Sequence, residues 1–220
     1  MSYYKFLRPS GEGVFTGYDW VGSGGNWIDA GSPVSCQAGI HACRVEDLPY
    51  WLAEGLWRID LAGQIVTYKN KVAASRGRLG ARVEGWTTRT AREFSVACVG
   101  RVAQHAAAEL RDTSMWSLAE SVEAAVRVFV EDGDAVGLKL RALEGAAVPV
   151  HYRGSSANLL SAYITDALES LDAYPPAMLA YIAARAASQR RVSPSGDPYL
   201  DERRWQASWL ATRLGLSDSP

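Results

Sequence analysis

The residues best suited to chemistry lie close together in the stretch CQAGIHACR, which runs from Cys36 to Arg44. On an extended segment the side chains of His41 and Cys43 project to the same face, because they are two residues apart. A thiolate at either cysteine would be activated by the neighbouring imidazole and guanidinium groups, since a nearby cation lowers the pKa of a thiol. This pattern makes His41, Cys43 and Arg44 candidate catalytic residues, with His41 as general acid or base.

The same stretch also offers ligands for a zinc ion. Cys36, His41 and Cys43 would complete a tetrahedral Cys3His site together with Cys98, which lies later in the chain. Their C-x4-H-x-C spacing differs from the C-x2-4-C spacing typical of structural zinc. A third interpretation is that these side chains are simply buried, as free cysteines usually are. We therefore assign no metal ligand and keep a zinc-stabilised domain as an alternative.

Aromatic residues are concentrated around this stretch, namely Tyr18, Trp20, Trp27, Tyr50, Trp51 and Trp57. Because tryptophan is seldom found on a solvent-exposed surface, several of these rings should fill the core of a glycine-rich sheet. A ring left open would form a stacking platform for a planar ligand or a sugar. We expect Trp20 and Trp51 to contact such a ligand.

The elements that must position these residues change character near Trp86. Before it, short runs of aromatic and β-branched residues alternate with Gly, Pro, Asn and Asp, which predicts strands and turns. A short helix is expected with Asp47 as its N-cap and Pro49 in its first turn. After Trp86, apolar residues recur at helical spacing. This spacing predicts helices over residues 88–110, 117–130, 156–171, 177–191 and 200–214.

Two helix starts carry recognisable capping signals. Thr87 or Thr88 is suited to cap the first predicted helix, and Ser117 with Glu120 forms a capping-box pattern at the start of the second. The first predicted helix carries one apolar face, formed by Phe94, Cys98, Val102, His105 and Ala106. We expect His105 and Glu109, four residues apart, to interact at the polar margin of that face.

Strands followed by helices predict an α+β protein, with a mainly antiparallel N-terminal sheet and a C-terminal helical layer or bundle. The regions are 1–86, which would bind a ligand, and 87–220, which could continue the same domain.

The chain has 220 residues and a formal net charge of -1. That charge gives no global attraction for a polyanion, so no nucleic-acid partner is expected. Arg76-Gly77-Arg78, near Lys69 and Lys71, forms a local basic cluster, interpreted as a hairpin turn or a phosphate site.

The expected location is the cytoplasm. No signal pattern is recognisable in residues 1–10, no long apolar run predicts a membrane partner, and three cysteines suit a reducing compartment. His151 lies in a predicted loop and has no recognisable partner by spacing. The C-terminal helices would allow a homodimer.

The string CQAGIHACRVEDLPYWL, with YKFL before it and LWRIDLAG and KVAASRGRL after it, resembles a group of uncharacterised actinobacterial proteins and related phage-encoded domains. This resemblance covers about the first hundred residues. It implies no particular activity.

A more distant resemblance is to ADP-ribosyltransferases of the poly(ADP-ribose) polymerase kind. In that family a Gly-Ile-Tyr-Phe-Ala strand precedes a short helix and then an apolar strand, and the counterparts here are residues 39–43, 47–52 and 56–63. The resemblance would make residues 4–8 the first strand, whose polar residue holds the nicotinamide ribose. It implies ligand-binding roles for Tyr4 and Arg8, with Glu84 the nearest candidate for a catalytic glutamate.

We therefore expect a cytoplasmic protein that binds a small molecule in a cleft of its N-terminal sheet. If it is an enzyme, a transferase-like or lyase-like reaction on a nucleotide-sized or aromatic ligand is favoured, with His41 as acid or base. Arg8 or Arg44 would bind an anionic group of that ligand. The alternative is a non-catalytic interaction or regulatory module that docks a partner through exposed tryptophans. No cofactor is indicated.

Overall fold

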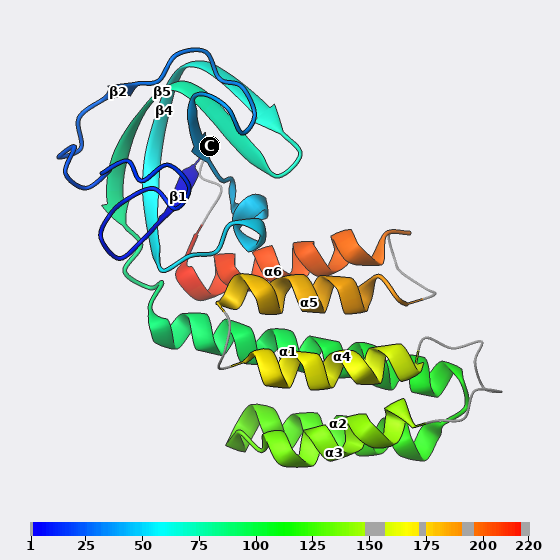
Figure 1. The fold of residues 1–220 in the computed structure, drawn as a ribbon. Coiled ribbons are helices and arrows are strands. Elements are labelled where there is room, and N and C mark those ends of the chain that lie inside the picture. Colours follow the sequence, from blue (N-terminus) through cyan, green and yellow to red (C-terminus); the bar gives the residue numbers. More distant parts are fainter. Residues whose placement is uncertain (1, 148–156, 172–174, 191–195, 217–220) are drawn as a thin grey trace. The chain divides into compact units, whose positions relative to one another are not determined.

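The computed structural model describes residues 2–147, 157–171, 175–190 and 196–216 (Figure 1). An antiparallel sheet forms in the N-terminal half and helices form in the C-terminal half, which confirms the α+β prediction. The chain divides into two compact units, Met1–Ala91 with Gln206–Pro220, and Arg92–Trp205. The first unit thus includes the end of the chain as well as the whole sheet. His151 lies outside the described residues.

The sheet belongs to the first unit and is antiparallel throughout. Its strand order is β1 (Tyr3–Leu7), β4 (Gly55–Tyr68), β5 (Lys71–Arg82) and β2 (Ile28–Asp29), and β3 (Ile40–Ala42) also pairs with β5. Two hydrogen bonds link the end of β3 back to β1, from Tyr4 N to Cys43 O at 2.8 Å and from Cys43 N to Tyr4 O at 2.7 Å. Strands β1, β4, β5 and β3 therefore close into a ring.

The long strand β4 bends enough to take part in this closure. Its pairing with β5 shifts register between Trp57 and Ile59 and again between Ala62 and Ile65. Gly63, with φ of 72°, lies at the second irregularity. Such bulges bend a strand and increase its local twist. The Arg76-Gly77-Arg78 cluster lies inside β5, so the expectation of a turn there is wrong.

The interior of the ring holds a hydrophobic core built from several strands, formed by Leu7, Trp20, Ile40, Ala42, Ile59 and Leu79. Because side chains alternate along a strand, Lys5 projects from β1 to the same side as Leu7. A lysine is therefore carried toward the interior by a strand whose other residues there are apolar.

The short helix before β4 begins earlier than predicted. It is a 3-10 helix over Val45–Tyr50 with Arg44 as the N-cap, and Asp47 is its third residue rather than its cap. The Asp47 carboxylate accepts a hydrogen bond from Arg44 N at 3.0 Å. The expectation of Asp47 as N-cap is thus wrong, because its carboxylate reaches back to the first residue in the manner of a capping box.

The described helices are α1 (Thr88–Asp112), α2 (Trp116–Asp132), α3 (Ala135–Ala146), α4 (Ala157–Ser170), α5 (Pro176–Ala187) and α6 (Pro198–Leu214). Five of them overlap the predicted ranges. Thr87 caps α1, since its Oγ1 accepts from Thr90 N at 3.2 Å. The predicted capping box at Ser117 is wrong, because α2 starts at Trp116 and Met115 is its N-cap without a side-chain bond.

Helix α3 was not predicted from the sequence. Gly133 ends α2 in the left-handed conformation, with φ of 79°, and Asp134 then accepts from Gly137 N at 3.0 Å. One glycine and one aspartate thus stop a helix and start the next within two residues. A sequence pattern that looks like a loop is here a junction between helices.

The apolar face of α1 is buried as predicted, with Phe94, Cys98, Val102 and Ala106 all fully buried. His105 is also buried, so its expected place at a polar margin is wrong. Its Nε2 lies 2.9 Å from Oε2 of Glu202 on α6, and Arg101 Nη2 lies 2.8 Å from the same oxygen. The second unit thus contains a buried cluster of charged and polar side chains.

Candidate functional site

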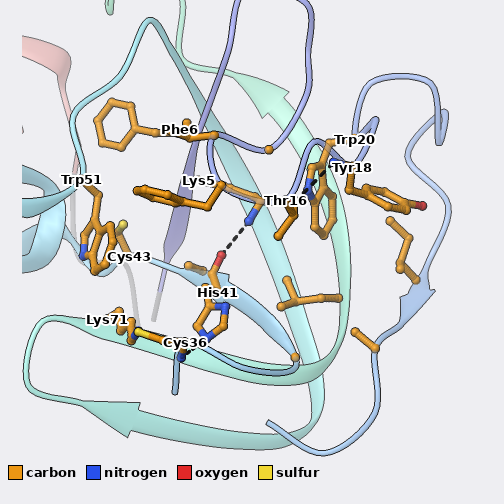
Figure 2. A pocket seen from close by; sticks show the side chains of 18 of the residues that line it. Lys5, Phe6, Thr16, Tyr18, Trp20, Cys36, His41, Cys43, Trp51 and Lys71 are labelled. Carbon is orange, nitrogen blue, oxygen red and sulfur yellow. Dashed lines mark hydrogen bonds between the residues drawn. The ribbon is translucent and has the colours of Figure 1, made fainter. Parts of the chain in front are cut away.

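A cavity of ≈ 570 Å³ lies in the first unit beside the interior of the ring (Figure 2). It is bounded by β1, β3, the start of β5 and the loops before and after β2. Its aromatic walls come from Phe6, Phe15, Tyr18, Trp20 and Trp51, and its polar groups include Lys5, Thr16, Cys36, His41 and Lys71. The lining thus combines planar apolar surfaces with two amines.

Lys5 is the amine carried into the cavity by β1. Its Nζ donates a hydrogen bond to His41 O at 2.8 Å and lies 4.7 Å from the centroid of the Trp20 ring. Among the described residues that line the cavity there is no Asp or Glu. Burial lowers the pKa of Lys5 to about 8. Lys5 is therefore a charge-bearing group held among aromatic rings without a carboxylate beside it in the cavity wall.

His41 connects β3 to the loop that contains Cys36. Its Nε2 accepts a hydrogen bond from Cys36 N at 3.3 Å, and the ring also hydrogen-bonds to the backbone of Val34. Burial, followed by the charges of Lys71 and Lys5, lowers the pKa of His41. The imidazole is thus neutral at pH 7 and anchors the loop. Its neighbour Ala42 belongs to the hydrophobic core and also lines the cavity.

Cys36 and Lys71 meet at the edge of the cavity. Lys71 Nζ lies 2.7 Å from Cys36 Sγ and lies 5.5 Å from the centroid of the Trp51 ring. The hydrogen bond from Lys71, followed by one from Ser35, lowers the pKa of the Cys36 thiol. Cys36 is exposed, whereas Lys71 is buried. Cys36 is thus a solvent-accessible cysteine next to an amine, and its surroundings favour the thiolate form.

The other two cysteines have the opposite electrostatic environment. Cys43 lines the cavity but is buried, and burial, followed by the charge of Asp47, raises the pKa of its thiol. Cys98 is fully buried in α1, and burial raises its pKa as well. Of the three cysteines, Cys36 is the one whose surroundings favour the thiolate.

Arg44, expected to be catalytic or to bind an anion, is not among the residues that line the cavity. Its Nε lies 2.7 Å from Asp47 Oδ2, and its Nη1 lies 2.8 Å from Glu46 Oε1. The guanidinium is therefore engaged by two carboxylates of the short helix. It organises the end of β3 rather than the cavity wall.

The four residues expected to bind a ligand fall into two groups. Trp20 and Trp51 line the cavity, whereas Tyr4 and Arg8 do not. Tyr4 is buried, and its hydroxyl has no hydrogen-bond partner among the described residues. Arg8 is exposed and donates to Val14 O at 2.9 Å. Glu84, the glutamate suggested by resemblance, is exposed and also outside the lining.

The four proposed zinc ligands do not form one group. Cys36, His41 and Cys43 line the cavity, whereas Cys98 belongs to α1 in the second unit. Across the residues for which the structure gives positions, no three His, Cys, Asp or Glu side chains are grouped so as to hold a metal ion.

Lys5 and Lys71 line the cavity but were not predicted from the sequence to be site residues. The signal for Lys5 was present, since a lysine at the centre of the strand YYKFL falls on the same face as Leu7. The sequence placed Lys71 only near the basic cluster of Arg76-Gly77-Arg78, and no pattern predicted its contact with Cys36. Its contact with Cys36, 35 residues away, depends on how the loop folds over the start of β5.

Comparisons with protein-family models, with curated proteins and with solved structures found no match to this chain. Within the described ranges, none of the helices combines the length and the apolar character needed to cross a lipid bilayer.

Proposed function

We propose that the first unit binds a small anionic molecule that has a planar or apolar part, and that the cavity beside β1 and β3 is the binding site. The observation that carries this proposal is Lys5, an amine in an aromatic cavity with no Asp or Glu among the described lining residues. The anion would take the place of the missing carboxylate.

Removing the charged Lys5 side chain from water costs free energy. An ammonium group that leaves water without a counter-ion is destabilised, which is why burial lowers the pKa of Lys5. One backbone carbonyl, His41 O, offsets part of that cost. A bound anion would remove much of the remainder. Strongly perturbed pKa values of groups in clefts cluster at functional sites for this reason.

The size and walls of the cavity support a small organic ligand rather than a bare ion. A volume of ≈ 570 Å³ falls in the range of about 300 to 1,000 Å³ that is common for such sites. Phe15 contacts Trp51 edge to face, with centroids 6.0 Å apart, and Tyr18 contacts Trp20 in the same way at 5.3 Å. These rings offer flat surfaces for a planar group.

We favour binding over acid–base catalysis because of the hydrogen bonds of His41. A catalytic imidazole needs a ring nitrogen available to the substrate. Here Nε2 accepts from Cys36 N, and the ring also bonds to the backbone of Val34. Transfer of ADP-ribose, which the distant resemblance would imply, gains no support from Glu84, since it does not line the cavity. Binding therefore needs fewer assumptions.

The test is a fluorescence titration with 8-anilinonaphthalene-1-sulfonate, a planar aromatic anion. The wild-type protein should bind one equivalent, and Lys5→Met should weaken binding by about tenfold or more, as expected for loss of a partly buried charged hydrogen bond. Lys5→Arg should retain part of the affinity. Lys69→Met is the matched control, because Lys69 is exposed in the turn between β4 and β5.

Circular dichroism and thermal unfolding would establish that each variant is folded before its affinity is compared. Equal affinities for wild type and a folded Lys5→Met variant would contradict the proposal. The same conclusion would follow if Lys69→Met weakened binding as much as Lys5→Met, because the probe would then respond to general surface charge.

A further inference from the structure

We propose that Cys36 and Lys71 are a site of oxidative modification, at which hydrogen peroxide joins Cys36 Sγ to Lys71 Nζ in a covalent sulfur–nitrogen bond. The proposal concerns side chains that lie together at the cavity edge but far apart in sequence. It does not depend on the identity of any ligand.

The geometry places both reacting atoms in contact before any reaction occurs. Nζ of Lys71 lies 2.7 Å from Sγ of Cys36. The rings of Trp51 and Tyr68, with centroids 5.5 and 5.9 Å from Nζ, confine the amine on β5. The backbone hydrogen bond from Cys36 N to His41 holds the cysteine from the other side. Such pre-positioning removes much of the entropy cost of joining two groups.

Exposure and charge make Cys36 the cysteine that an oxidant should attack. Peroxide reacts with thiolates, and both accessibility and a stabilised thiolate favour that reaction. Cys36 is exposed and has an ammonium beside it, whereas Cys43 and Cys98 are buried. Within one chain, no second accessible thiol is therefore present to capture the oxidised sulfur as a disulfide.

The first step oxidises the sulfur. Sγ attacks one oxygen of hydrogen peroxide, the O–O bond breaks, and the other oxygen leaves as hydroxide, which takes up a proton to become water. Sulfur is oxidised by two electrons and peroxide is reduced by two electrons. The product is a sulfenic acid, which condenses with nearby thiols or nitrogen nucleophiles.

The second step forms the cross-link. The lone pair of the deprotonated Lys71 amine attacks Sγ, the S–O bond breaks, and the oxygen leaves as a second water after taking up a proton released by the nitrogen. Overall, one thiol, one amine and one peroxide give one sulfenamide and two waters. The hydroxide released in the first step takes its proton from Lys71 Nζ, which leaves the amine with the lone pair that attacks.

The cross-link would change the cavity, because both residues line it. It would tie the loop at Cys36 to the start of β5 and remove the charge of Lys71. Weaker binding of an anion is the consequence, and this consequence alone rests on the proposed function. The covalent step is tested separately from it.

The experiment treats the full-length native protein with stoichiometric hydrogen peroxide and follows it by intact-mass and tryptic peptide mass spectrometry. We expect loss of two hydrogens. The peptide ending at Arg44 should be joined to the peptide Asn70–Arg76, with Lys71 uncleaved, and reduction with dithiothreitol should separate them. Cys36→Ser should not form this species, and Lys71→Arg should instead stop at oxygen adducts of Cys36, the first of which is the sulfenic acid.

Several outcomes would overturn the proposal. Native wild-type protein that yields only oxygen adducts of Cys36, with no linked peptide, would do so irrespective of how the variants fold. A disulfide between two chains as the main product would also overturn it. So would equal cross-linking in urea, since the reaction would then not depend on the folded contact between Cys36 and Lys71.

Discussion

The surroundings of the Lys5 side chain favour a binding role over a purely structural one. It occupies a strand position that faces the same side as Leu7, and its Nζ finds a backbone carbonyl and the face of Trp20 but no carboxylate of the cavity lining. A purely structural role would be served better by an apolar residue. Proteins commonly give up stability in this way at functional sites.

Replacement of Lys5 by an apolar residue should therefore make the fold more stable. Lys5→Met keeps the length of the side chain and removes the charge, so it should raise the free energy of unfolding at pH 7 by about 1 to 3 kcal/mol. Because the folded-state pKa of Lys5 is lowered to about 8, the advantage of the variant should shrink as pH rises through 8. Urea denaturation at several pH values would measure both effects. A variant less stable than wild type at pH 7 would show that Lys5 is structurally required.

At the scale of elements, the loop between β2 and β3 places Cys36 and His41. Gly39, with φ of 90°, enters β3 from this loop, and a Cβ there would lie 2.9 Å from Pro33 Cα and 3.0 Å from Ala74 O. Both are backbone atoms, so the chain itself would have to shift to relieve these contacts. The loop can therefore reach β3 only through a glycine at this position.

We expect Gly39→Ala to lower the free energy of unfolding by about 2 to 3 kcal/mol through combined backbone strain and steric overlap. Gly31→Ala is the matched control. Gly31 also has a positive φ, 67°, but a Cβ there meets nothing within 4 Å, so only the conformational cost of about 1 kcal/mol applies. Chemical denaturation of both variants provides the comparison. Equal costs would mean that the close approach at Pro33 and Ala74 is unimportant.

The contact between His105 and Glu202, both in the second unit, predicts sensitivity to acid. Burial lowers the pKa of His105, although its hydrogen bond to Glu202 acts in the opposite direction. The folded state therefore binds fewer protons than the unfolded state, and stability is lost as pH falls below the ordinary histidine value of 6.5. The lowered pKa of Glu202 adds a further loss below 4.5.

We predict that His105→Gln, which keeps an N–H donor for Glu202, will reduce the loss of stability between pH 7 and pH 5. One proton contributes at most about 1.4 kcal/mol per pH unit. The comparison is with wild type, because the lowered pKa of His41 acts over the same range in both proteins. Urea denaturation across this range is the measurement, and an unchanged pH slope in the variant would contradict the assignment.

Local sequence patterns predicted the α+β class, five helices and a change of character near Trp86. They did not predict α3, because Gly133 and Asp134 end one helix and start the next within two residues. They also did not predict contacts between residues that are far apart in the sequence. The CQAGIHACR stretch does contribute to the cavity wall, through Cys36, His41 and Cys43. Periodicity could not show that His41 binds backbone or that Cys36 faces Lys71, because both contacts depend on loop closure.

At the scale of the whole molecule, the two units carry different kinds of polar group. The cavity of the first unit is lined by two amines with no Asp or Glu among its described lining residues, whereas the cluster of Arg101, His105 and Glu202 in the second unit is internally paired. The net charge of -1 hides this local excess of positive charge in the cavity. A homodimer formed through the C-terminal helices stays a prediction.

Proton linkage of the whole protein tests the central claim that Lys5 makes the cavity an anion site. At a pH slightly above 8, a large share of the free protein should hold Lys5 as a neutral amine, since its pKa is lowered to about 8. A bound anion favours the ammonium, so binding must draw a proton from the buffer. Isothermal titration calorimetry with 8-anilinonaphthalene-1-sulfonate in two buffers of different ionisation enthalpy measures this uptake. The account predicts uptake of a fraction of a proton by wild type and by Lys69→Met but none by Lys5→Met, whereas binding without proton uptake by wild type would contradict it.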